Sequence, residues 1–206
     1  MTKPGDLDPA AFQPEAAAGA GQPAWVTPEL PPAYADLASR IAALREDARK
    51  FEDIAGVLWQ TGPALALSVC RLFSALGFQA ERTAADANYD VRVQLDGDRR
   101  LLVEVTGGTE AVPKKSPSIT RLLRALQDDV WEHDRLVVAV NAFCDRPLDA
   151  REDPVSTDAL RLFQRLGANV VTTATLFGIW KYSLVDLDAA RKSITRLHGQ
   201  DGGVFR

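Results

Sequence analysis

Residues 89–107 decide the fold of this chain, and they read Tyr89-Asp90-Val91-Arg92-Val93-Gln94-Leu95, Asp96-Gly97-Asp98, then Arg99-Arg100-Leu101-Leu102-Val103-Glu104-Val105-Thr106-Gly107. Two largely apolar arms flank an Asp-Gly turn, which is the pattern of a β-hairpin. Side chains alternate faces along a strand, so Asp90 and Arg92 share one face of the first arm. If the turn centres on Gly97, Asp90 lies opposite Glu104. A register slip of one residue would remove this match.

The composition is that of a globular protein with one main domain. The chain has 206 residues, of which 46% are hydrophobic and 25% charged, enough to bury a substantial core. A net charge of -4 gives no overall nucleic-acid footprint, although a local basic patch is compatible with it. Cys70 and Cys144 lack metal-ligand spacing and are expected to be reduced core thiols. No signal-peptide pattern and no apolar run of ~20 residues is found, so we expect a cytoplasmic protein without a membrane partner.

The first third of the chain predicts a tail followed by a helix. Residues 1–32 are rich in Ala, Pro, Gly and acidic groups and are expected to be a disordered tail. Residues 33–60 are expected to form a long helical arm, because apolar residues recur at alternating steps of four and three. These are Leu37, Ile41, Leu44, Ala48, Phe51, Ala55 and Leu58. The seam either packs on its own domain or, through residues 37–58, forms a homodimeric coiled coil.

Residues 61–198 predict an α/β domain. The expected helices are 61–75, 118–133 with Ser118 as N-cap, 156–166, 174–185 and 188–197. The expected strands are 78–82, the two arms of the hairpin, the apolar run 136–140 ending in Asn141, and 169–173. An unbroken apolar strand suits a sheet covered on both faces. We therefore expect a three-layer α/β/α sandwich around a central mixed sheet, with residues 199–206 as a frayed tail.

Asp90 and Glu104 pose the chemical question. Two adjacent carboxylates do not both ionise cheaply unless a positive group lies nearby. One solution is Mg²⁺, which prefers oxygen ligands and could activate a water for attack on a phosphodiester. The other is an ion pair on a solvated face, with Arg82, Arg92 or Arg100 as the partner. The hairpin alone leaves both open.

The order of the elements resembles the PD-(D/E)xK restriction-endonuclease-like superfamily, and in particular bacterial single-domain members with a preceding long helix. The resemblance covers about residues 51 to 182. It is carried by short motifs: Trp59-Gln60-Thr61-Gly62-Pro63-Ala64-Leu65, Leu76-Gly77-Phe78, Asp90, Glu104-Val105-Thr106-Gly107, Asn141, Pro147 with Arg151, and Thr172-Thr173 before Leu176-Phe177.

This resemblance implies a metal-dependent nuclease. Asp90, Glu104 and the backbone carbonyl of Val105 would hold Mg²⁺. The motif lysine, which orients the attacking water and balances negative charge, would stand at position 106. Here that position is Thr106, and Gln60 stands where an assisting acidic residue is often found. A threonine can bind a water but carries no charge.

Three interpretations of the missing lysine remain open. Lys114 or Lys115 could reach back into the site, Arg92 could supply the charge, or the site is inactive and the module binds nucleic acid or a protein partner without cleaving it. Lys114, Lys115, Arg121 and Arg124 form a local basic cluster beside the expected site. This cluster would contact the phosphate backbone of DNA or RNA.

Overall fold

The computed structural model describes residues 23–128 and 132–205. Most of the expected N-terminal tail lies outside these residues. In the part of the expected tail that the structure does describe, Ala24–Glu29 form a 3-10 helix, η2. This part is therefore ordered and not a disordered tail. The chain divides into two compact units, Met1–Glu46 and Asp47–Arg206. The second unit begins at Asp47, before residue 61, where the sequence places the start of the α/β domain.

The expected long helix is present as α1, Pro32–Ala55. It ends before residue 60, where Gly56–Leu58 form the 3-10 helix η3. Gly56 explains the tight packing of this turn. A Cβ at position 56 would lie 2.6 Å from the Ser68 hydroxyl and 2.7 Å from the Gln60 side chain. Glycine is thus the residue that lets the chain approach these side chains.

The second unit contains a six-stranded mixed sheet whose strands follow one another in sequence order. The strands are β1 Gln79–Arg82, β2 Val91–Gln94, β3 Arg100–Gly108, β4 Asp134–Ala142, β5 Asn169–Thr172 and β6 Gly203–Phe205. β1, β2 and β3 pair antiparallel, and β3 to β6 pair parallel. The predicted central mixed sheet is confirmed.

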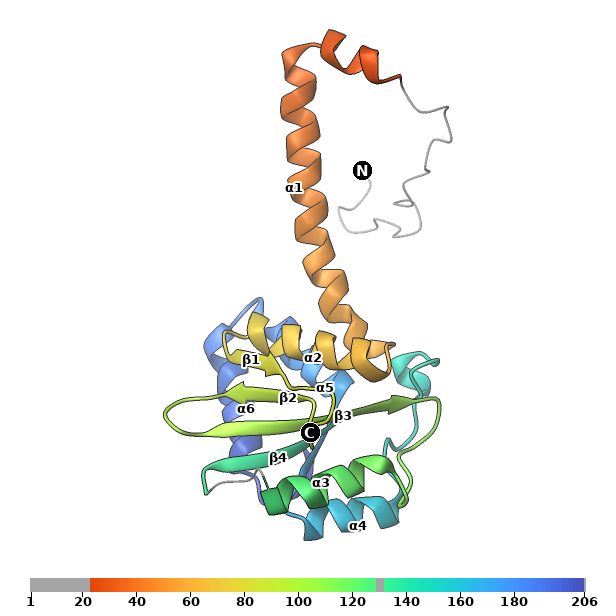
Figure 1. Cartoon of the computed structure of the whole chain (residues 1–206), viewed down its shortest axis with the longest axis vertical. Helices are drawn as coiled ribbons and strands as arrows, with labels where there is room; N and C mark the ends of the chain where they lie inside the picture. The colour runs from red at the N-terminus through yellow and green to blue at the C-terminus, as the bar shows by residue number, and fades with distance from the viewer. Residues whose placement is uncertain (1–22, 129–131, 206) are drawn as a thin grey trace, which may run out of the picture. The chain divides into compact units, whose positions relative to one another are not determined.

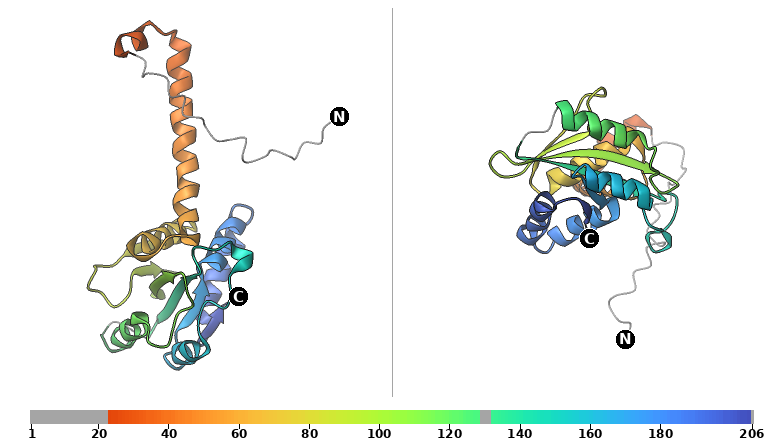
Figure 2. Two further views of the ribbon diagram at one scale, coloured as in Figure 1. Left: turned by 90° about the vertical axis from the view of Figure 1, so that its right-hand side faces the viewer. Right: turned by 90° about the horizontal axis from the view of Figure 1, so that it is seen from below.

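Helices cover both faces of this sheet (Figures 1 and 2). One face is covered by α2 Gly62–Ala75, α5 Thr173–Ser183 and α6 Leu187–Gly199, and the other by α3 Pro117–Asp128 and α4 Thr157–Arg165. β3 shows why two cores form: Leu101 and Val103 belong to the first core and Leu102 to the second. The predicted three-layer α/β/α sandwich is therefore confirmed.

The hairpin has the expected register. Val91 pairs with Val103, and Arg92 pairs with Leu102. The Asp90 amide donates to the Val103 carbonyl at 2.9 Å, which continues the pairing toward Asp90 and Glu104. Gly97 adopts φ +56° in the turn, a conformation that glycine tolerates at low cost.

Both ends that the sequence predicted for the helix before β4 differ in the structure. Helix α3 begins at Pro117, and the Ser116 hydroxyl accepts from the Ser118 amide. Ser118 is therefore inside the helix, since proline favours the first helical position. His133 lies in a turn before β4 and not in the helix.

The expected frayed tail is wrong for the residues that the structure describes. Gly203–Phe205 pair in parallel with β5 as an edge strand. Gly202 and Gly203 turn the chain with φ +70° and +115°, and the Phe205 ring is buried in the first core. None of the helices in the described part of the chain has both the length and the apolar character needed to cross a membrane.

Candidate functional site

Asp90 and Glu104 lie on the sheet face that α3 and α4 cover. Even-numbered Leu102 of β3 belongs to the core on this side, and strand alternation places Glu104 on the same face. The Glu104 side chain is only 2% exposed, whereas that of Asp90 is 23% exposed. A carboxylate buried to this degree requires a charged or hydrogen-bonding partner.

Arg121 of α3 is that partner, and it contacts both acids. Its Nη1 lies 3.0 Å from Oε1 and 2.8 Å from Oε2 of Glu104. Its Nη2 donates to Oδ1 of Asp90 at 3.0 Å, and Nη1 lies 3.3 Å from Oδ2. The guanidinium therefore forms a bridge between the two carboxylates, a geometry that its planar fork favours.

Backbone groups complete this acid–arginine site. The Val105 amide donates to Oδ2 of Asp90 at 2.8 Å, and Nη2 of Arg121 donates to the Ala87 carbonyl at 3.1 Å. These contacts hold the loop before β2 against β3 and α3. The arginine is thus ordered by three separate parts of the chain.

Burial dominates the electrostatics of Glu104. Desolvation and the neighbouring Asp90 charge raise its pKa to about 8, against the opposing effects of the Arg121 charge and a hydrogen bond with Ser118. Burial by itself disfavours the charged form of Arg121. Its hydrogen bonds and charge interactions with Asp90 and Glu104 outweigh burial and raise the arginine pKa further. The arginine stays charged, and Glu104 is the group of the site that titrates near neutral pH.

In this arrangement a cation of the chain itself, Arg121, lies between the two acids. Within residues 23–128 and 132–205 there is no group of three or more His, Cys, Asp or Glu side chains placed to hold one. The carboxylate oxygens that would coordinate Mg²⁺ instead receive the Arg121 donors. A cation would have to displace a guanidinium that both acids already bind.

The structure places the other predicted site residues apart from this bridge. Lys114, Lys115 and Arg124 are exposed, and no ion pair joins either lysine to Glu104 among the residues described. Thr106 lines a hollow of about 260 Å³ at the C-terminal end of β3, together with residues 107–113 and Ser116. Arg92 pairs with Glu81 at 2.8 Å, and Arg100 pairs with Asp134. Neither supplies charge to Asp90 or Glu104.

Arg121 is expected from the sequence to belong to a phosphate-contacting cluster, and its role as the partner of the acids was missed. Its position in the helix contains a signal that could have identified it. Ile119, Leu122 and Ala125 are the buried apolar residues of α3, and Arg121 lies beside them at the border of that face. A charged residue at such a border needs a partner on the surface that the helix covers.

A second polar cluster joins several motifs of the sequence. Asn141, at the end of β4, donates to the Gln60 carbonyl at 2.8 Å and accepts from Arg151 at 2.8 Å and Thr173 at 3.2 Å. Gly107 lies against it, since a Cβ there would be 2.9 Å from Leu65 and 3.3 Å from Asn141. The cluster ties the ends of β3 and β4 to the start of α2.

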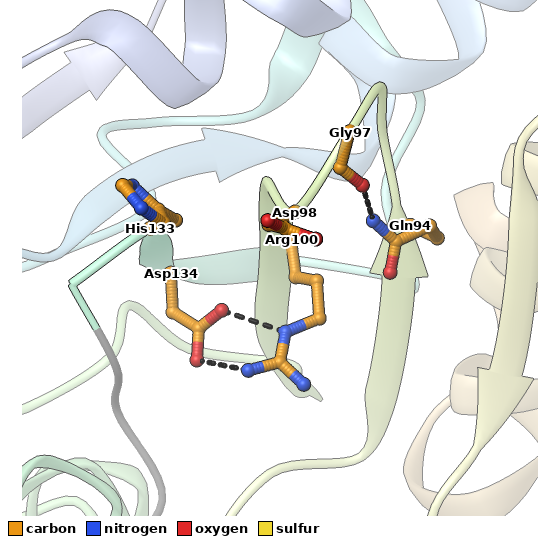
Figure 3. A pocket seen from close by; sticks show the side chains of 6 residues that line it. All are labelled: Gln94, Gly97, Asp98, Arg100, His133 and Asp134. Carbon is orange, nitrogen blue, oxygen red and sulfur yellow. Dashed lines mark hydrogen bonds and ion pairs between the residues drawn. The ribbon is translucent and has the colours of Figure 1, made fainter.

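Figure 3 shows a further hollow, of about 400 Å³, at the opposite end of β3. Nε and Nη2 of Arg100 donate to the Asp134 carboxylate at 2.7 and 2.9 Å, so its charged groups pair with each other. His133 also lines this hollow. Nothing in this geometry assigns chemistry to it.

Comparisons with known proteins give little beyond this geometry. No family model and no curated protein matches the chain. The restriction endonuclease FokI has a similar structure, with a TM-score of 0.47 and 10% sequence identity over 68% of this chain. The chain spans 28% of the length of that endonuclease chain.

Proposed function

We propose that this protein is a nuclease-like module that binds nucleic acid without cleaving it, and that Arg121 takes the place of a catalytic metal. The contact of one guanidinium with both Asp90 and Glu104 supports this proposal above all else. The two acids occupy the positions that correspond to the metal ligands of the PD-(D/E)xK motif, which the sequence resembles. Arg121 already balances the Asp90 charge, and burial raises the pKa of Glu104 to about 8, so that below this pH its carboxyl is largely neutral.

The other features of the site favour the same conclusion. Phosphodiester hydrolysis needs an activated water and positive charge for the transition state. Thr106 is uncharged, and Lys114 and Lys115 make no ion pair with Glu104 among the described residues. Arg121 is positive but is held by the two acids. Among the residues that the structure describes at this site, the two carboxyl groups that could activate a water are both in contact with Arg121.

Nucleic-acid binding follows from the exposed cations beside the site. Lys114 and Lys115 lie on the loop after β3, and Arg124 lies on α3. All three side chains are exposed, so they can contact phosphate oxygens at little desolvation cost. Such contacts give affinity that falls with salt and does not depend on base sequence.

A Mg²⁺-dependent nuclease, as the sequence resemblance implies, is the second candidate. It is favoured by the convergence of both carboxylates on one cation, as the Arg121 contacts record. For it to operate, Arg121 would have to leave the acids, and Asp90, Glu104 and the Val105 carbonyl would hold Mg²⁺.

Cleavage and binding assays separate the two functions. We expect no cleavage of single- or double-stranded DNA or RNA with Mg²⁺ or Mn²⁺. Mg²⁺-dependent cleavage that is lost in both Asp90→Ala and Glu104→Ala would overturn the proposal and support the enzyme.

Binding is tested by titrating labelled DNA and RNA with the full chain at several salt concentrations. The double variant Lys114→Glu/Lys115→Glu should lower affinity at least about tenfold, because it removes two phosphate contacts and adds repulsion. Lys181→Glu/Lys192→Glu is the matched control, since both lysines are exposed on α5 and α6. Absence of binding in the wild type, or equal losses in the two variants, would contradict the nucleic-acid part of the proposal.

The structural role of Arg121 is tested by unfolding. Arg121→Met should lower the free energy of unfolding by about 2–3 kcal/mol, because it leaves the partly buried Asp90 carboxylate without its cation and the buried Glu104 carboxyl without its hydrogen-bond donor. Arg124→Met, on the exposed face of the same helix, should change it by less than about 0.5 kcal/mol. Equal effects of the two substitutions would mean that the bridge contributes little.

A further inference from the structure

Helix α1 presents an apolar seam that the described residues leave exposed. Tyr34, Leu37, Ile41 and Leu44 are between 48% and 68% exposed. Near the end of the helix, Ile54 is buried, with 7% of its surface exposed. Exposed large apolar residues at heptad spacing are typical of a helix that packs against another helix.

The charges beside this seam determine which pairing of two copies is favourable. In the heptad register, Tyr34, Ile41 and Ala48 occupy position a, and Leu37, Leu44 and Phe51 occupy position d. The flanking g positions hold Arg40 and Asp47, and the e positions hold Arg45 and Glu52. These flanking residues lie closest to the partner helix and set its direction.

A parallel pair is disfavoured by these charges. In a parallel coiled coil, each g residue faces the e residue of the next heptad of the partner. Arg40 would face Arg45 of the second copy, and Asp47 would face Glu52. Both contacts between charged flanking residues would join like charges.

An antiparallel pair brings g residues against g residues, and only one of the overlapping registers is free of like charges. With Ile41 opposite Leu44 of the second copy, Arg40 faces Asp47 of that copy, and the reverse contact follows by symmetry. A shift of one heptad places Asp47 against Asp47, and a shift in the other direction places Arg40 against Arg40. Leu37 then packs opposite Ala48, a large residue against a small one.

We propose that α1 is a homodimerisation element, in which two copies pair antiparallel about a two-fold axis between residues 42 and 43. The complementary charges of Arg40 and Asp47 argue for a second copy of this chain as the occupant of the seam. Asp47 is already paired with Lys50 at 2.9 Å. That pair is exposed and lies within one helix turn, so it is weak and does not exclude Arg40. This inference does not depend on the function proposed above.

Molecular mass in solution tests the dimer. The full chain has a monomer mass of 22.4 kDa, and a concentration series by sedimentation equilibrium should show association toward twice that mass. Leu44→Asp should remove the association, whereas Ser39→Asp, on the outward face, should keep it. A mass that stays monomeric throughout, or dimers that survive Leu44→Asp, would overturn the proposal.

Charge reversal tests the direction of the pair. Arg40→Glu or Asp47→Arg alone should weaken the dimer about tenfold, because two attractive contacts become repulsive, and the double variant should restore it. A parallel dimer predicts the opposite, since each single change would create an attraction to Arg45 or Glu52. Tighter association in the single variants would therefore overturn the antiparallel register. Far-UV circular dichroism of each variant separates loss of the dimer from loss of the helix.

Discussion

At the scale of single residues, Arg121 determines what the acidic pair can do. A carboxylate as buried as Glu104 is costly to ionise, and a second acid beside it raises that cost. The arginine lowers it by contacting both groups at once. The same contacts occupy the oxygens that a metal would need, so stabilisation of the fold and metal binding compete for one set of atoms.

The raised pKa of Glu104 predicts a pH dependence of stability. In the folded protein this pKa is about 8, against 4.5 for the free side chain. Between these values the folded state holds a proton that the unfolded state has lost, so increasing pH favours unfolding. The free energy of unfolding should therefore fall from about pH 4.5 to about pH 8, by at most ~1.4 kcal/mol per pH unit, and level off above.

Glu104→Gln is the comparison that isolates this effect, because glutamine keeps the shape and does not titrate. Chemical denaturation of both proteins across this pH range gives the difference curve. A difference that stays flat, or that grows in favour of the wild type as pH rises, would show that Glu104 is ionised in the fold.

At the scale of elements, the ends of β3 and β4 are positioned by side chains from distant segments. Asn141 joins β4 to the start of α2 through the Gln60 carbonyl and accepts from Arg151 and Thr173. Arg151 also donates to the carbonyls of Arg146 and Leu58. This cluster determines where the loops at one end of the sheet lie, and therefore the shape of the surface beside Thr106.

Removing the amide of Asn141 should be costly. Asn141→Ala leaves a buried donor-and-acceptor network without its centre and is expected to lower the free energy of unfolding by about 2–4 kcal/mol. Gln127→Ala removes an exposed amide on α3 and should change it by less than about 0.5 kcal/mol. Urea denaturation measures both. One ordinary hydrogen bond contributes about 1 kcal/mol. A smaller loss of unfolding free energy for Asn141→Ala would indicate that water takes over the hydrogen bonds of the Asn141 amide.

At the scale of the whole molecule, the proposed function depends on two kinds of basic side chain. One is bound to the acids inside the protein, and the others are exposed to solvent. Arg121 is held by Asp90 and Glu104, whereas Lys114 and Lys115 on the loop before α3 and Arg124 on α3 are exposed. In the proposed function the protein would present these exposed cations to nucleic acid while Arg121 stays with the acids. This separation is compatible with a net charge of -4, because binding depends on the local patch.

Metal addition and removal test this division on the full chain. Mg²⁺ or EDTA should move the thermal midpoint of the wild type by less than about 1 °C, because a ligand stabilises a protein only if it binds the folded state. The same titration of Arg121→Met is the sensitive comparison, since only there are both acids released. A midpoint that rises with Mg²⁺ in the wild type and not in Asp90→Asn would show a working metal site.

Much of the fold could be predicted from the sequence because it depends on local chemistry. The Asp-Gly turn and the alternation of residues 91–95 and 101–105 determine the hairpin register, so Asp90 was correctly expected opposite Glu104. The helix expected to begin at Ser156 is α4, and Ser156 is its N-cap. The apolar run from Leu136 predicted a strand covered on both faces, and Val137 and Val138 are buried in separate cores.

Only the tertiary structure decided which partners these elements meet. Arg121 is 17 residues from Glu104 and 31 from Asp90, and no local pattern specifies which face of α3 settles over β3. Gly203–Phe205 become a strand because β5 offers an unpaired edge, which their own short sequence does not predict. The sequence by itself determined the two acids and their register, because both follow from the alternation of one hairpin. The packing of α3 determined that their cation is an arginine.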